Sequence, residues 1–135
     1  MKYLTLTGAA LLPLTLIACT AQDKTNASSS SETANYQDTL QIQLLDAKPG
    51  DVITIPEGTF NIDRGLSLTV DGVTLRGAGI DKSILSFKGQ VAGAEGLLVT
   101  ANDFIIEDLA IEDTKGDALK INEGNNIIIR RVRTE

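Results

Sequence analysis

The chain has 135 residues, of which 42% are hydrophobic and 22% are charged, and its formal net charge is −6. An acidic balance argues against non-specific nucleic-acid binding, because phosphate neutralisation needs clustered cations. The sequence contains no His, which excludes His-based acid–base catalysis, a Ser-His-Asp triad and a His-ligated zinc site. Beyond an N-terminal segment of 18 residues, the remaining length supports one domain at most.

Residues 1–18 are predicted to be an export signal. An apolar run over residues 4–18 is too short to span a bilayer core about 30 Å thick, whereas its length is typical of a signal-peptide core. The run ends in Leu16-Ile17-Ala18-Cys19, which resembles the bacterial lipobox. That resemblance implies cleavage before Cys19 and diacylation of its thiol. The alternative is a plain secretory signal followed by an incidental cysteine.

A diacylated Cys19 predicts a membrane-anchored protein of the bacterial cell envelope, because two acyl chains give stable anchoring. Thr20 follows Cys19 where an Asp would stand in some lipoproteins. By resemblance to the lipoproteins of two-membrane bacteria, this favours the outer membrane over the inner one. Cys19 is the only cysteine in the sequence, so acylation leaves neither an intrachain disulfide nor a thiol nucleophile.

Residues 19–35 are predicted to form a disordered tether. They contain no large apolar side chain, and Ser28 to Ser31 are four consecutive serines. Such a segment buries too little apolar surface to offset the entropy of ordering. We therefore expect it to hold a folded body away from a membrane surface.

Residues 36–48 are predicted to cap the folded body. Alternate apolar residues within this segment fit a strand, whereas Tyr36, Leu40 and Leu44 recur at helical spacing. We favour a short amphipathic helix, which ends before Pro49 and Gly50.

Beyond Pro49 the sequence changes to short β-branched runs between turn residues, and 11 of the 12 glycines lie in this part. Ten candidate strands with no helical pattern between them are typical of a sandwich, a barrel or a solenoid. They cover residues 52–55, 59–62, 66–70, 73–76, 84–87, 97–100, 104–107, 110–112, 119–122 and 127–130.

Internal repeats favour the solenoid. Residues 97–107 align with 119–130 at an offset of 22, which becomes 23 after the turn, and residues 66–76 align with 97–107 at an offset of 31. A coil of about 22 residues, expanded once by about nine residues near Gly89 to Gly93, predicts an all-β, parallel β-helix over residues 49–135. The inward columns are apolar throughout, as a stacked core requires. They are Leu66/Leu97/Leu119, Leu68/Val99/Ile121, Val73/Phe104/Ile127 and Leu75/Ile106/Ile129, and the bends Asp71-Gly72, Asn102-Asp103 and Asn125-Asn126 coincide.

The outward columns predict ion pairs between coils. Coils about 4.8 Å apart place alternating charges side by side, each pair contributing about 0.2–1 kcal/mol. We therefore interpret the arginines near Glu135 as partners in such pairs rather than as an anion-binding patch. One column is acidic throughout, and its members would repel, bind a cation or diverge in loops. The paired columns are Arg76/Glu107/Arg130 and Asp108/Arg131, the arginine cluster is Arg130-Arg131-Val132-Arg133, and the acidic column is Asp81/Glu112/Glu135.

Residues 49–60, 72–79 and 117–121 resemble the opening coils of right-handed parallel β-helix proteins of the pectin-lyase-like superfamily. The resemblance covers residues 46–135 and implies that the segment before Pro49 caps one end of the solenoid. It also implies a function in polysaccharide binding or processing. In the lyases and uronan epimerases of this superfamily, acidic residues bind calcium or neutralise the sugar carboxylate, and a Lys or Arg abstracts the adjacent proton.

The region that matches the superfamily's substrate-binding side is residues 112–122. The resemblance implies that Lys115 and Lys120 are catalytic and that Asp113 and Asp117 bind Ca²⁺ or the substrate carboxylate. The alternative is that these are ordinary polar residues of a turn. Mannuronan epimerases carry an Asp-Pro-His-Asp motif, whereas Asp113-Thr114-Lys115-Gly116-Asp117 has another spacing and no His, so that motif's assignment does not transfer.

The repeat pattern continues to Glu135 without a terminal cap, and we expect the sequence to be the N-terminal part of a longer β-helix. We expect this part alone to be inactive. The preferred function is that of an envelope lipoprotein that binds or processes a carbohydrate. One alternative is a polyuronide lyase or C5-epimerase acting by proton abstraction, and another is a structural or partner-binding scaffold without sugar chemistry. An acidic polysaccharide would need a local basic groove or calcium bridges, because the whole chain is acidic.

Overall fold

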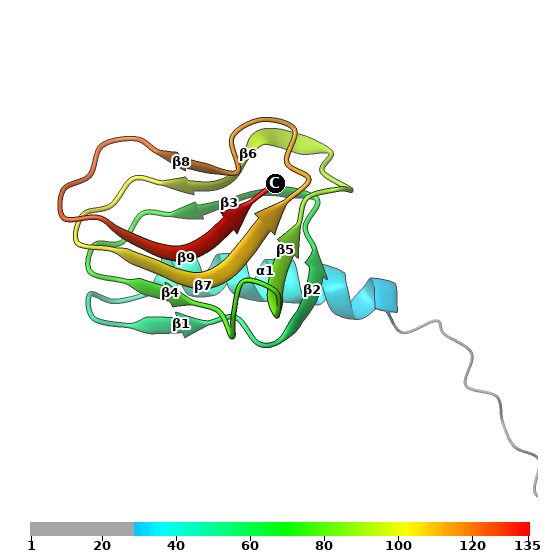
Figure 1. Cartoon of the computed structure of the whole chain (residues 1–135), viewed down its shortest axis with the longest axis horizontal. Helices are drawn as coiled ribbons and strands as arrows, with labels where there is room; N and C mark the ends of the chain where they lie inside the picture. Colours follow the sequence, from blue (N-terminus) through cyan, green and yellow to red (C-terminus); the bar gives the residue numbers. More distant parts are fainter. Residues whose placement is uncertain (1–28) are drawn as a thin grey trace, which may run out of the picture.

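The computed structural model describes residues 29–135, so the predicted signal peptide and Cys19 lie outside the described residues. The described chain forms a parallel β-solenoid of about three turns with one helix (Figure 1). None of its helices is long and apolar enough to cross a membrane. In chain order the elements are α1 (Ser29–Asp46), β1 (Val52–Thr54), β2 (Gly58–Asn61), β3 (Arg64–Leu68), β4 (Thr74–Arg76), β5 (Ser83–Ser86), β6 (Ala92–Val99), β7 (Ile105–Glu112), β8 (Leu119–Ile121) and β9 (Ile128–Thr134).

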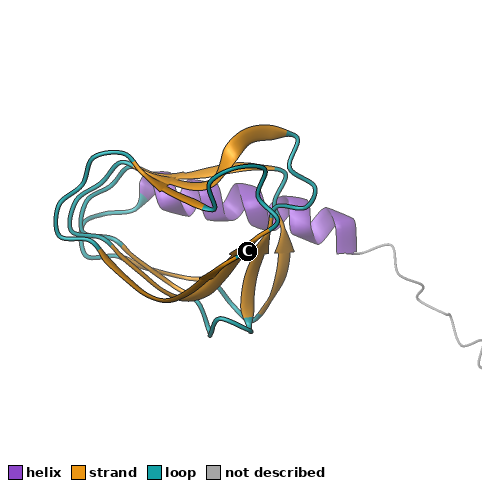
Figure 2. Ribbon diagram, turned by 45° about the horizontal axis from the view of Figure 1, so that its top comes forward, coloured by secondary structure: helices purple, strands orange, loops and turns teal. Residues whose placement is uncertain are grey.

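The strands form two parallel sheets on different sides of the solenoid. Sheet A contains six strands, with β1, β4, β7, β5 and β2 in order and β9 added beside β7. Sheet B contains three strands in the order β3, β6 and β8. Every strand pair is parallel, and Figure 2 shows that the strands and turns of successive coils lie above one another. The predicted solenoid class is therefore confirmed.

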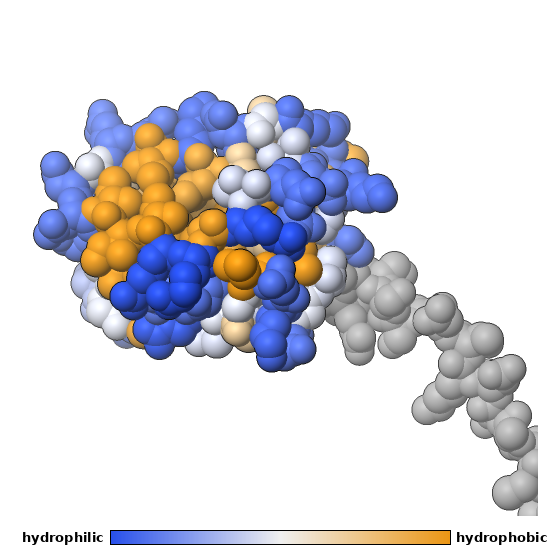
Figure 3. All heavy atoms as spheres, in the orientation of Figure 1, coloured by the Kyte–Doolittle hydropathy of each residue, from blue (hydrophilic) through white to orange (hydrophobic). Residues whose placement is uncertain are grey.

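The predicted inward columns are confirmed by the strand register. In sheet B, Leu68 pairs with Val99 and Val99 with Ile121, and in sheet A the file of Leu75 and Ile106 continues to Ile129. The inward side chains of the earlier coils are buried. Ile129 is 45% exposed, because no further coil covers it in the described structure. Figure 3 shows hydrophobic residues gathered on the face where β8 and β9 lie in Figure 1.

The predicted nine-residue expansion is correct in size and only partly correct in place. The offset between the first two coils grows in three steps, from 22 to 25, 28 and 31 residues, rather than at one loop near Gly89 to Gly93. The steps lie before β5, between β5 and β6, and within β6. Loop length changes free energy only slowly, so apolar periodicity carries little information about where a loop expands. The pairs that define the four offsets are Val52 with Thr74, Gly58 with Ser83, Arg64 with Ala92 and Leu66 with Leu97.

Helix α1 covers one end of the solenoid, as predicted for the segment before Pro49. Leu40 and Leu44 are fully buried and belong to the same core as the inward strand residues. The helix begins at Ser29 rather than near Tyr36, so residues 29–35 of the predicted tether are helical.

Two glutamines of α1 replace a neighbouring strand along the edge of sheet B. The side-chain amide of Gln41 accepts a hydrogen bond from the Ser67 N–H at 2.9 Å and donates one to the Ser67 carbonyl at 3.2 Å. One turn earlier, Gln37 accepts a hydrogen bond from the Asp63 N–H at 2.7 Å. An amide side chain carries both a donor and an acceptor, as a strand backbone does. The helix therefore satisfies polar groups of the edge strand β3 that would otherwise face outward.

Candidate functional site

The predicted site residues lie on the rim, which we define as residues 113–117 between β7 and β8, and on Lys120 of β8. Asp113 has a left-handed backbone, with φ of 60°. Its Oδ2 accepts a hydrogen bond from the hydroxyl of Ser86 on β5 at 3.0 Å. Asp113 is therefore tied to sheet A, whereas Lys120 belongs to sheet B. Asp113 and Lys120 therefore contact different partners and do not form one site.

Lys120 forms an ion pair that the sequence analysis did not identify. Its Nζ lies 2.8 Å from Oε1 of Glu95 on β6, and both side chains are about one-third exposed. The hydrogen bond and the charge of Glu95 raise the pKa of Lys120, and Asp117 adds to this effect. In return, Lys120 lowers the pKa of Glu95. A general base needs a depressed amine pKa, so this environment favours a permanently charged contact over proton abstraction.

Lys115 and Asp117 are exposed on the rim. The backbone of this loop is held by Gln90, whose Oε1 accepts a hydrogen bond from the Lys115 N–H at 3.1 Å. The Nε2 of Gln90 donates to the carbonyl of Glu95 at 2.9 Å, and the Gln90 side chain is almost fully buried. Gln90 thus connects the rim to the strand that carries the partner of Lys120.

The rim does not fit a calcium ion. Ca²⁺ takes six to eight oxygen ligands, several of them from carboxylates. Within residues 29–135 no group of three or more His, Cys, Asp and Glu side chains is placed to hold a metal. Asp113 is engaged by Ser86, and Asp117 lies toward Lys120.

A shallow groove lies over β3 and β6 of sheet B, and Glu95, the partner of Lys120, is part of its lining. Between the pairs Arg64 with Ala92 and Leu66 with Leu97 the register shifts, so β6 bulges outward and forms one wall. A side chain at Gly65 would approach the carbonyl oxygen of Glu95 to 2.9 Å, so only glycine fits where the strand passes the bulge. We call this the sheet B groove. It is lined by Arg64, Gly65, Leu66, Ser67, Ala92, Gly93, Glu95 and Leu98.

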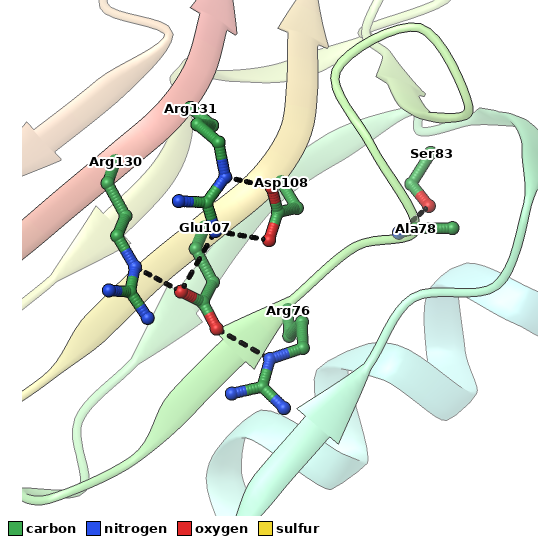
Figure 4. Close-up of polar contacts among 7 residues, drawn as sticks. All are labelled: Arg76, Ala78, Ser83, Glu107, Asp108, Arg130 and Arg131. Carbon is green, nitrogen blue, oxygen red and sulfur yellow. Dashed lines mark hydrogen bonds and ion pairs between the residues drawn. The ribbon is translucent and has the colours of Figure 1, made fainter.

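The predicted ion pairs on the outer face of sheet A are confirmed (Figure 4). Arg76 Nε lies 2.5 Å from Oε1 of Glu107, and Arg130 Nε contacts the other carboxylate oxygen. Arg131 binds Asp108 through two nitrogens, with Nε to Oδ1 at 2.5 Å and Nη2 to Oδ2 at 2.7 Å. The pKa of Glu107 is lowered, chiefly by its hydrogen bonds from Arg130 and Arg76.

The three acids of the predicted acidic column, Asp81, Glu112 and Glu135, surround the guanidinium group of Arg133. Arg133 contacts Glu112 directly, and its guanidinium lies 3.9 Å from Asp81 and 3.7 Å from Glu135. In the strand register Arg133 stands beside Ala110 rather than beside Glu112. Alignment by column therefore could not identify this contact, because the long side chain reaches over to the neighbouring position.

Glu95, Gln90 and Arg64 are the residues of this region that the sequence analysis missed. Glu95 and Gln90 lie in the expanded part of the second coil, where no repeat alignment places them beside a partner. Their polar character was the only available signal, and it is shared with many surface residues. Comparison with protein-family models, with curated proteins and with solved structures finds no match for this chain.

Proposed function

We propose that this protein binds an acidic polysaccharide without turning it over, as an envelope-anchored, right-handed parallel β-helix of the pectin-lyase-like kind. The observation that carries the binding proposal is the ion pair of Lys120 with Glu95 beside the sheet B groove. Because Glu95 keeps the amine charged, Lys120 suits recognition of a sugar carboxylate better than removal of a proton. The lipobox-like sequence ending in Cys19 supports the anchor, and the matched segments support the superfamily.

The groove offers a consistent set of contacts to a sugar chain. Ser67 and Leu98 line the groove, and Lys120 follows them in register on the next strand, two strand spacings, about 10 Å, from Ser67. The hydroxyl of Ser67 suits hydrogen bonds to sugar hydroxyls, and Leu98 provides an apolar contact. Arg64, whose side chain is 60% exposed and pairs with Asp63 at 3.1 Å, places a second cation at the groove. These groups would hold a chain with carboxylates at intervals.

The test is a calorimetric titration of the full chain with oligogalacturonate and with oligomannuronate, which measures the affinity for each. Lys120→Ala is expected to weaken binding about tenfold, the effect of losing one charge-assisted contact. Lys82→Ala is the matched control, because Lys82 forms an exposed ion pair with Glu57 at 3.2 Å. Equal affinity of the Lys120→Ala and Lys82→Ala variants would contradict the proposed site.

The same samples distinguish the alternative functions. Release of unsaturated products that absorb in the ultraviolet would support the lyase alternative and overturn binding without turnover. Absence of binding to both oligosaccharides would favour a scaffold without sugar chemistry.

A further inference from the structure

Around Glu107, the outer face of sheet A exposes guanidinium groups more than the carboxylates with which they pair. The side chain of Glu107 is 2% exposed, whereas those of Arg76, Arg130 and Arg131 are 49%, 53% and 56% exposed. Asp108, the other acid of the cluster, is 25% exposed. Three guanidinium groups against two carboxylates leave one net positive charge. A ligand approaching this face therefore meets guanidinium groups first.

Arg76 and Arg130 hold Glu107 in a way that leaves their terminal amino groups available. Each contacts the carboxylate through Nε. In the described part of the chain, the Nη groups of these two arginines make no hydrogen bond. In Figure 4 the contacts of Arg76 and Arg130 with Glu107 start from Nε, and no dashed line reaches their terminal nitrogens. An arginine fork can bind the two oxygens of a carboxylate through parallel hydrogen bonds.

We infer that Arg76 and Arg130 form a binding site for a linear polycarboxylate that runs across the strands, parallel to the solenoid axis. Arg76, Glu107 and Arg130 are consecutive in register on β4, β7 and β9. The backbones of the two arginines are therefore two strand spacings apart, about 9.6 Å, whereas their guanidinium groups converge on the two oxygens of Glu107. Each fork takes one carboxylate of the polymer. A net charge of +1 suits singly charged carboxylates better than doubly charged phosphates.

Glu107 is a positioning residue for this site. Both of its oxygens are engaged, and its strand lies between those of the two arginines. The arginine side chains are therefore ordered before a ligand arrives, which reduces the entropy that binding would otherwise lose. The site lies on sheet A, apart from the sheet B groove, and does not depend on Lys120.

The experiment measures oligogalacturonate affinity of the full chain by calorimetry and its dependence on salt. The double variant Arg76→Lys/Arg130→Lys retains charges that can pair with Glu107 but removes both forks, so it should stay folded. We expect it to bind at least about tenfold more weakly, whereas Lys82→Gln, which alters an exposed cation elsewhere, leaves affinity unchanged. Circular dichroism and urea unfolding report whether each variant keeps the fold.

Three further results decide the outcome. Affinity of the double variant equal to that of the parent chain would overturn the site. Binding of inorganic phosphate or polyphosphate as tight as that of oligogalacturonate would overturn the assignment to carboxylates. Additive losses of oligogalacturonate affinity when Lys120→Ala is combined with the double variant would support two separate contacts. If only Lys120→Ala lowered the affinity, the sheet B groove would be the binding surface and this inference would be wrong.

Discussion

Asp108 and Arg131 occupy equivalent positions in consecutive coils, and both have a left-handed backbone, with φ of 60° and 50°. Their side chains form a two-nitrogen ion pair across the coils. The bend at Asp108 lets the single strand β7 pair with β4 before it and with β5 after it. The sequence analysis predicted two separate strands here, at residues 104–107 and 110–112. The structure joins them because one left-handed residue turns the chain without ending the strand.

Gly77 is predicted to be essential where the neighbouring coil passes this bend. Its N–H donates to the Glu107 carbonyl at 2.9 Å, and an added Cβ would lie 2.1 Å from the Asp108 carbonyl oxygen. Gly77→Ala should lower the free energy of unfolding by about 1–3 kcal/mol or more, because backbone must move. Gly89→Ala is the control, since a Cβ added at Gly89 would meet nothing within 4 Å, and it should change stability by less than about 0.5 kcal/mol. Urea unfolding of both variants measures the difference, and equal values would argue against the close approach.

The file of Leu75, Ile106 and Ile129 predicts unequal effects of the same truncation. Ile106 is fully buried, and Ile106→Ala should destabilise the protein by about 2–5 kcal/mol through lost burial and a residual cavity. Ile129 stands directly above it in the register but is 45% exposed. Ile129→Ala should therefore lower the free energy of unfolding by about 1 kcal/mol or less. Denaturant midpoints of the two variants provide the comparison, and similar losses would contradict the observed burial.

Gln41 is predicted to stabilise the capped edge of sheet B. Gln41→Ala removes both hydrogen bonds to Ser67 and should lower the free energy of unfolding by about 1–2 kcal/mol. Gln43 is an exposed glutamine of the same helix and provides a control with the same helix propensity. Gln43→Ala is expected to have little effect. If thermal or urea unfolding finds the two substitutions equivalent, the edge-covering role of Gln41 is wrong.

Glu107 is predicted to make the fold sensitive to acid. Its arginine partners lower the pKa of Glu107 in the folded state, so its stabilising contribution is complete above the ordinary glutamate pKa of about 4.3. That contribution is lost as the pH falls through the lowered pKa of the folded state. Glu107→Gln should reduce stability at neutral pH and should flatten the decline below about pH 5 relative to the parent chain. Urea midpoints measured from neutral to acidic pH would detect this, and parallel curves for the two proteins would contradict it.

The inward columns of the solenoid could be predicted because strand alternation and a repeat of about 22 residues both constrain the same positions. Leu68, Val99 and Ile121 are an example, since each is apolar in sequence and stands in one file in the structure. The ion pairs of Glu107 were predictable for the same reason, because outward residues of successive coils share a register. Periodicity is therefore informative wherever the chain lies in a regular strand.

The candidate site was less accessible to prediction. The residues of the rim were identified through a family resemblance, but the partner of Lys120 was not, because Glu95 lies in a bulge that interrupts the repeat. The same resemblance grouped Asp113 with Lys120, whereas the hydroxyl of Ser86 holds Asp113, which has a left-handed backbone, at the other sheet. Irregular backbone of this kind has no periodic signature.

The sequence by itself determined the solenoid, its core columns and the stacked charges, because repeated apolar spacing allows few ways to bury the same side chains. Only the tertiary structure decided where the second coil expands, which carboxylate holds Lys120 and which cation neutralises the acids around Arg133. Those contacts join residues through loops and long side chains, whose reach depends on the folded backbone rather than on spacing along the chain.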